Sequence, residues 1–132
     1  VIIDLYVETH LKVGKISKTA TNIYVRSISE KKLADLLTKY NFKYVYEKKT
    51  KVGSYDFSPD FYLPDYDIYI EFYGLIHDEE YNDKHKWKKK QYLRNRLHCI
   101  AVYPNHLEWE EKKLIKWLIE QIRLHNNLSK KS

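Results

Sequence analysis

The sequence predicts an α/β domain in which helices pack on a central mixed sheet. Segments with helical periodicity alternate with short segments rich in β-branched and aromatic residues, in the order helix, three strands, helix, strand, helix. The chain has 132 residues, of which 43% are hydrophobic, and this suits one domain with one core. An α/β sandwich follows from that order, with helices packed on the faces of the central sheet and the acidic residues described below on its strands.

Residues 1–24 are the least informative segment, and we expect an accessory segment without a function of its own. Residues 1–3 and 5–7 are apolar enough to form a strand, whereas Gly14 and the Lys-, Ser- and Thr-rich stretch after it indicate a loop. Because the sequence contains no methionine, even at position 1, we expect the native start to be missing or removed, and Val1 to continue from an upstream segment.

The first helix is predicted to begin at Ser27. Ser27 and Glu30 have the spacing of a capping box, and Ser29 is an alternative cap. The helix is predicted to run to Tyr40 and to bury an apolar stripe. This stripe consists of Leu33, Ala34, Leu36 and Leu37.

Three strands are predicted next, over residues 42–47, 55–63 and 67–73. Between the first two lies a basic turn, made of Lys48, Lys49, Lys51 and Gly53. Pro64-Asp65 is predicted to join the second strand to the third as a hairpin.

The predicted hairpin places two carboxylates together. Since strand residues alternate between faces, Ile68, Ile70 and Phe72 form a core face, and Glu71 lies on the opposite face among tyrosines. An ionised carboxylate there is costly unless it is paired with a cation, a metal or hydrogen-bond donors. Asp60 returns to the same end of the hairpin as Glu71, and two such oxygen donors suit a hard divalent cation.

A basic helix is predicted over residues 81–97, after a loop that contains His77. Its cations are Lys84, Lys86, Lys88, Lys89, Lys90, Arg94 and Arg96. At helical spacing, one stripe that faces the sheet would hold Tyr81, Lys84, His85, Lys88 and Tyr92.

The remaining elements are a buried strand over residues 98–103, a turn at Pro104-Asn105 and a long amphipathic helix over residues 107–127. Residues 129–132 are predicted to form a frayed tail.

Around the two carboxylates the chain resembles the PD-(D/E)xK nuclease superfamily, which has the restriction-endonuclease-like fold. Pro59-Asp60 corresponds to the "PD" and Glu71 to the "E", and the basic helix that follows strengthens the resemblance. It extends over about residues 25–107, and we expect the nuclease domain to occupy residues 25–128. The predicted order of elements agrees with the αβββαβ core that the resemblance implies. One position departs from the pattern, because Tyr73 stands where the lysine is expected.

The resemblance implies roles for individual residues. Asp60 and Glu71 would be metal ligands together with the backbone carbonyl of Phe72, for Mg²⁺ or, in its place, Mn²⁺. Glu30 either caps the first helix or joins the metal site as an outer or second-metal ligand. In relatives that lack the usual lysine, that residue migrates to the next helix, where Trp87-Lys88 and Tyr92 match the variant. Lys88 is therefore expected to orient the attacking water and to counter negative charge.

The charge of the chain favours a polyanionic partner. Lys and Arg number 24 against 18 Asp and Glu, giving a net charge of +6. The residues expected to bind nucleic acid are Lys48, Lys49, Lys51, His77, Lys84 and Lys89. Lys84 and Lys89 are also weaker candidates than Lys88 for the catalytic lysine. Such contacts are largely independent of sequence, and no helix-turn-helix or zinc finger is visible.

The single cysteine, Cys99, excludes an intrachain disulfide and a cysteine-based zinc site, and it favours an intracellular location. No apolar run approaches membrane-spanning length, so we expect no membrane association.

The leading hypothesis is a Mg²⁺-dependent DNA endonuclease that recognises DNA structure or local context. A Holliday-junction-resolving nuclease on a dimeric scaffold is one alternative, and a non-catalytic DNA-binding module on the same fold is another. The resemblance also makes a helicase or another DNA-processing protein a plausible partner, and it is compatible with a homodimer.

Overall fold

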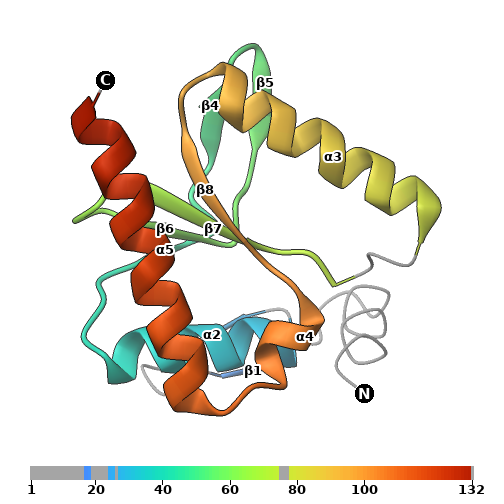
Figure 1. The fold of residues 1–132 in the computed structure, drawn as a ribbon. Helices are drawn as coiled ribbons and strands as arrows, with labels where there is room; N and C mark the ends of the chain where they lie inside the picture. The colour runs from blue at the N-terminus through green and yellow to red at the C-terminus, as the bar shows by residue number, and fades with distance from the viewer. Residues whose placement is uncertain (1–16, 19–23, 26, 75–77, 132) are drawn as a thin grey trace.

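The computed structural model describes residues 17–18, 24–25, 27–74 and 78–131. Within them it has helices and a four-stranded mixed sheet, as expected for the α/β class (Figure 1). The helices are α2 (Ile28–Lys39), α3 (Glu79–Arg94), α4 (Pro104–Leu107) and α5 (Glu111–Lys131). The strands are β1 (Ser17–Lys18), β2 (Tyr24–Val25), β3 (Val45–Tyr46), β4 (Thr50–Val52), β5 (Tyr55–Phe57), β6 (Phe61–Leu63), β7 (Ile68–Phe72) and β8 (His98–Val102).

The central sheet has the strand order β3-β6-β7-β8. The β3–β6 and β6–β7 pairs are antiparallel, while β7 and β8 are parallel and are connected through α3. The predicted hairpin is therefore present as β6–β7, and its register pairs Phe61 with Ile70 and Leu63 with Ile68.

The two faces of this sheet are covered by different helices. In Figure 1, α2 and α5 lie on one side of the sheet and α3 lies on the other. The main core fills the first side, where Ile68, Ile70 and Phe72 pack against apolar residues of α2 and α5. On the second side, Tyr69 packs with Tyr92 of α3 and with Val52 and Phe57 of a small hairpin, β4–β5. The predicted division of β7 into two faces is thus observed.

The predicted strand over residues 55–63 is wrong, because the chain forms two strands there. Pro59 has no backbone N–H to continue a strand ladder, and residues 58–60 separate β5 from β6. The predicted basic turn at 48–53 is also wrong in part, since Thr50–Val52 forms β4 and pairs with β5. Only the tip of this hairpin is a turn, and Gly53 adopts a left-handed backbone conformation there, with φ of 64°.

The helices differ from the predicted ranges at their ends. Helix α2 begins after the predicted N-cap Ser27, whose hydroxyl accepts a hydrogen bond from the Glu30 N–H at 3.1 Å. Helix α3 ends at Arg94, because Arg96 takes a φ of 56° and the Leu97 N–H bonds back to the Tyr92 carbonyl.

In the C-terminal part, the turn predicted at Pro104-Asn105 is wrong, because α4 lies there. The helix predicted over 107–127 is present as α5, which begins later, at Glu111. Pro104 lies in the first turn of α4, where its missing N–H costs nothing. Helix α5 extends to Lys131, beyond the predicted end at residue 127 and into the predicted tail.

At the N-terminus, β1 lies where a loop was predicted after Gly14, and it pairs with β2. The strand predicted within residues 1–7 lies outside the described residues. No helix in the described ranges combines the length and apolar character needed to cross a bilayer.

Candidate functional site

The β6–β7 hairpin brings Asp60 and Glu71 together. Its turn is closed by a hydrogen bond from the Tyr66 N–H to the Leu63 carbonyl, and Asp67 has a positive φ of 53°. Because Phe61 pairs with Ile70, the residues flanking that pair, Asp60 and Glu71, lie opposite each other. The Asp60 Oδ2 atom accepts a hydrogen bond of 2.7 Å from the Phe72 N–H, so the aspartate is held against the end of β7.

The Glu71 carboxylate is buried, and each of its oxygens has a partner. Lys88, from α3, places its ammonium 3.3 Å from Oε1. The Tyr73 hydroxyl donates a hydrogen bond of 2.8 Å to Oε2. The Lys88 side chain is 24% exposed and its Nζ also lies 5.3 Å from the centre of the Phe57 ring. The ammonium therefore lies between a buried carboxylate and the β4–β5 hairpin.

The site holds more negative than positive charge. The pKa of Asp60 is raised well above its ordinary value, first by burial and then by the charges of Glu30 and Glu71. The Phe72 N–H and the Lys88 ammonium lower the pKa of Asp60, but they do not outweigh those causes. Lys88 pairs with Glu71, while the charges of Glu30 and Glu71 both act on Asp60, so the acids outnumber this lysine. A divalent cation would relieve this excess of negative charge.

Glu30 is close enough to influence this site and is itself buried. Its Oε2 atom accepts a hydrogen bond of 2.6 Å from the Tyr46 hydroxyl. The cap of α2 that the structure shows is the Ser27 hydroxyl, which bonds to the Glu30 backbone. The Glu30 side chain is therefore held by Tyr46 of β3, and its charge is one cause of the raised pKa of Asp60.

The donor set fits a hard cation that keeps much of its own water. In the part of the chain that the structure describes, no three acidic, histidine or cysteine side chains are grouped closely enough to hold a metal ion. Two carboxylates, those of Asp60 and Glu71, are available as ligands. This number suits Mg²⁺, because the ion is commonly bound by one or two carboxylates and several waters. The present position of Glu30, with a hydrogen bond to Tyr46, does not make it a third ligand.

Two tyrosines, to which the sequence analysis gave no role at the site, lie beside Glu71. The pKa values of Tyr73 and Tyr92 are raised, chiefly by burial and then by the charge of Glu71. Both hydroxyls therefore remain protonated, and the Tyr73 hydroxyl supports the glutamate. The expected signal was present in the sequence, since Tyr73 follows Glu71 by two residues and such neighbours share a strand face.

The predicted stripe of α3 is present only in part. His85 and Tyr92 are buried against the sheet and Lys88 is half-buried, whereas Lys84 is exposed. The His85 ring packs against the Tyr73 ring, with 3.6 Å between ring centres and a tilt of 35°, and its Nε2 lies 2.8 Å from the Tyr103 hydroxyl. Burial and the neighbouring lysines lower the pKa of His85 to about 4.

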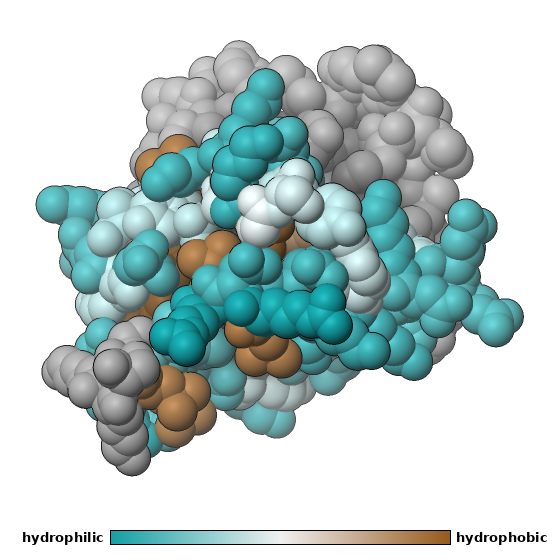
Figure 2. Space-filling view, turned by 90° about the horizontal axis from the view of Figure 1, so that it is seen from above, coloured by the Kyte–Doolittle hydropathy of each residue, from teal (hydrophilic) through white to brown (hydrophobic). Residues whose placement is uncertain are grey.

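The other predicted phosphate-contacting residues do not join the carboxylates. Lys48 places its Nζ 3.9 Å from the centre of the Tyr62 ring, and Lys51 forms an exposed ion pair with Asp56. Lys49 and Lys89 are exposed. His77 lies outside the described residues. From above, the side that carries α3 is mostly hydrophilic with separate hydrophobic areas (Figure 2).

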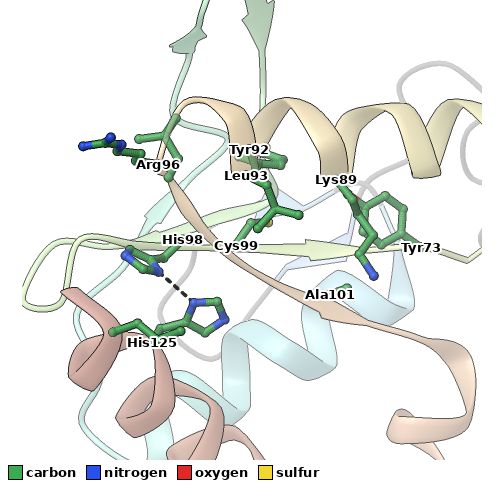
Figure 3. A pocket seen from close by; sticks show the side chains of 11 residues that line it. Tyr73, Lys89, Tyr92, Leu93, Arg96, His98, Cys99, Ala101 and His125 are labelled. Atoms are coloured by element: carbon green, nitrogen blue, oxygen red, sulfur yellow. Dashed lines mark hydrogen bonds between the residues drawn. The ribbon is translucent and has the colours of Figure 1, made fainter. Parts of the chain in front are cut away.

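A cavity of about 410 Å³ lies between α3, β8 and α5, beside the carboxylates but not lined by them. Figure 3 shows His98 and His125 at one end of it and Tyr73 with Lys89 at the other. The two imidazoles are joined by a hydrogen bond of 2.9 Å between their Nδ1 atoms. Lys89 therefore faces this mainly apolar cavity, on a different side of α3 from Lys88.

No family model, curated protein or solved structure matches this chain. The case for function therefore depends on the chemistry of the site.

Proposed function

We propose that this chain is a Mg²⁺-dependent deoxyribonuclease of the PD-(D/E)xK type, with the restriction-endonuclease-like fold. One observation carries the proposal: Asp60 and Glu71 converge at one end of the β6–β7 hairpin, and Lys88 from the next helix reaches the same point. The sheet order and the parallel β7–β8 pair are compatible with that fold.

Each residue has a distinct part in the proposed reaction. Asp60 and Glu71 would hold the cation, together with the Phe72 carbonyl. The bound cation would supply charge neutralisation at the phosphate and activation of water. The Lys88 ammonium would orient the attacking water and stabilise negative charge as it develops at phosphorus. The Tyr73 hydroxyl keeps Glu71 in place, and Glu30 adds negative charge that favours cation binding.

A second candidate is supported by a different observation. Each Glu71 oxygen already has a partner in Lys88 and Tyr73, and Asp60 is bonded to the Phe72 N–H. A site satisfied in this way would also suit a DNA-binding module that uses no metal and catalyses no reaction. In such a module the ion pair between Glu71 and Lys88 would be a structural contact.

Plasmid nicking separates the two candidates. The wild type should convert supercoiled plasmid to open circles in Mg²⁺ or Mn²⁺ and not in EDTA. Asp60→Asn and Glu71→Gln keep the size of each side chain and remove its charge, so both variants should lose nicking while retaining the circular dichroism of the wild type. Nicking that persists in both folded variants would refute the assigned site, and no nicking by the wild type in either metal would favour the module.

Linear, flap, splayed and four-way DNA, each with and without Mg²⁺, should then be compared. Cleavage confined to four-way junctions would identify the resolving-nuclease alternative.

A further inference from the structure

Two exposed aromatic rings lie beside the candidate site. Tyr55, on β5, is 46% exposed and Trp87, on α3, is 37% exposed. Their ring centres are 4.8 Å apart, and the rings meet edge to face at 81°. An aromatic ring held this far in solvent offers a planar apolar face to a ligand.

The packing of the hairpin does not account for this exposure. The hairpin is anchored to the molecule by Val52 and Phe57, which are 0% and 6% exposed and pack with Tyr69 and Tyr92. Tyr55 stands outside this cluster and contacts Trp87 and Phe57 at the surface. Burial of Val52 and Phe57 therefore holds the hairpin, and Tyr55 remains available.

A continuous series of contacts joins the two rings to the candidate site. The Phe57 ring lies 5.7 Å from the Trp87 ring, centre to centre, and 5.3 Å from the Lys88 Nζ. Lys88 in turn contacts Glu71. A strand whose phosphate reached Lys88 would therefore pass close to the aromatic pair.

The surroundings of Trp87 are cationic. Lys84 and Lys90 lie one turn before and after Trp87 on the same helix, and both are exposed. Among the described residues, neither of these lysines forms an ion pair with an acidic side chain. Aromatic rings between cations suit single-stranded nucleic acid, because bases stack on the rings while phosphates approach the ammonium groups. Bases that are paired within a duplex present no face to such rings.

We infer that Tyr55 and Trp87 form a stacking platform for unpaired bases, and that the substrate is DNA with single-stranded character next to the cleaved bond. This inference rests on the proposed nuclease function and narrows its substrate to flaps, splayed ends and single strands. The platform itself binds in the absence of a metal.

Binding in EDTA tests the platform without cleavage. Fluorescence anisotropy would compare a labelled thymidine 20-mer with a duplex of the same length, for the wild type and four variants. Trp87→Ala and Tyr55→Ala should each weaken binding of the single strand by roughly tenfold, because each removes a ring on which a base stacks. Both should change duplex binding by less than about twofold.

Two further variants serve as controls. Trp87→Phe keeps a ring and should restore most of the single-strand affinity. Leu93→Ala removes a 75% exposed apolar side chain from the same helix and should leave that affinity unchanged. Equal losses for single strand and duplex, or no loss in either alanine variant, would overturn the platform.

The fluorescence of Trp87 gives an independent reading. The chain has three tryptophans, so Trp109→Phe with Trp117→Phe leaves Trp87 as the sole reporter. The single strand should quench its emission and the duplex should not. If the single strand quenches the emission but the protein does not nick DNA, the nuclease proposal fails and the platform stands. If the protein nicks DNA without quenching and without preference for single strands, the platform fails and the nuclease proposal stands.

Discussion

The two faces of the central sheet differ in composition: one is apolar, and the other carries tyrosines and a buried ion pair. On the face covered by α2 and α5, β7 contributes Ile68, Ile70 and Phe72 to a core of aliphatic and aromatic side chains. On the face covered by α3, the same strand contributes Tyr69 and Glu71, and the helix supplies Lys88. The five residues of β7 are therefore divided between an apolar core and the face that carries the Glu71–Lys88 pair.

The difference shows how the fold tolerates a cluster of acids. Buried charge without compensation is costly, and the raised pKa of Asp60 is the sign of that cost. The opposite face stabilises the sheet through burial of apolar area. Substitutions on the two faces should consequently affect different properties.

The largest effect is expected on the apolar face, from Ile70→Ala. Ile70 is fully buried, so removing its side chain should lower the free energy of unfolding by about 2–5 kcal/mol. Urea denaturation followed by circular dichroism would measure the loss. Ile70→Val is the matched control and should cost only about 0.5–1.5 kcal/mol. Equal stability of the alanine variant and the wild type would contradict the assigned core.

On the charged face, Lys88→Gln should reduce single-turnover nicking by the proposed nuclease about 100- to 1000-fold, because the proposed role of the ammonium is to stabilise developing charge. The glutamine amide remains able to donate a hydrogen bond to Glu71. Lys89→Gln removes the same charge one residue further along, from the side that faces the cavity, and should change nicking only a few-fold. Comparable losses in the two variants would show that general phosphate attraction, not position, is responsible.

The Asp60→Asn variant should show how much the buried negative charge of Asp60 lowers the thermal stability of the protein. Since the folded-state pKa of Asp60 is raised, its contribution to stability is fully present below its unfolded pKa of about 3.8 and is lost as the pH rises through the folded value. Without metal, Asp60→Asn should thus unfold at a higher temperature than the wild type at pH 7, and the difference should shrink toward pH 4. The asparagine oxygen can still accept the bond from the Phe72 N–H. A variant that is less stable at pH 7 would contradict this account of the charge.

The smallest effect is expected at the cavity, from His125→Gln. Burial and the nearby His98 lower the pKa of His125, so its contribution is present above the unfolded pKa near 6.5 and is lost as the pH falls through the folded value. The midpoint of thermal unfolding should fall less between pH 7.5 and 5 in the variant than in the wild type. His85 and His106, whose pKa values are also lowered, remain in both proteins and cancel in the comparison. Identical pH profiles would exclude a buried neutral His125.

Features determined by local chemistry were predictable from the sequence. The Pro64-Asp65 turn and the alternation along residues 67–73 predicted the β6–β7 hairpin, and with it the meeting of Asp60 and Glu71. Ser27 identified the start of α2 through its capping hydroxyl.

Features determined by contacts between residues far apart in the sequence were not predictable in this way. β4 contains the exposed Lys51 and resembles a polar turn when considered alone, yet Val52 is buried against residues far along the chain. The support of Glu30 by Tyr46 joins a helix to a strand 16 residues later, and no spacing rule indicates it. The break between β5 and β6 did have a local signal, because Pro59 lacks a backbone N–H. The prediction of one strand over residues 55–63 did not take that signal into account.

The central claim is that Asp60 and Glu71 together hold a divalent cation beside Lys88. A titration with Mn²⁺ followed by electron paramagnetic resonance tests it most directly, because it counts bound ions without requiring cleavage. We predict one Mn²⁺ per wild-type chain, displaced by Mg²⁺, with binding lost in both Asp60→Asn and Glu71→Gln and retained in Lys89→Gln. A folded wild type that binds no Mn²⁺, or binding that survives in both acid variants, would contradict the account.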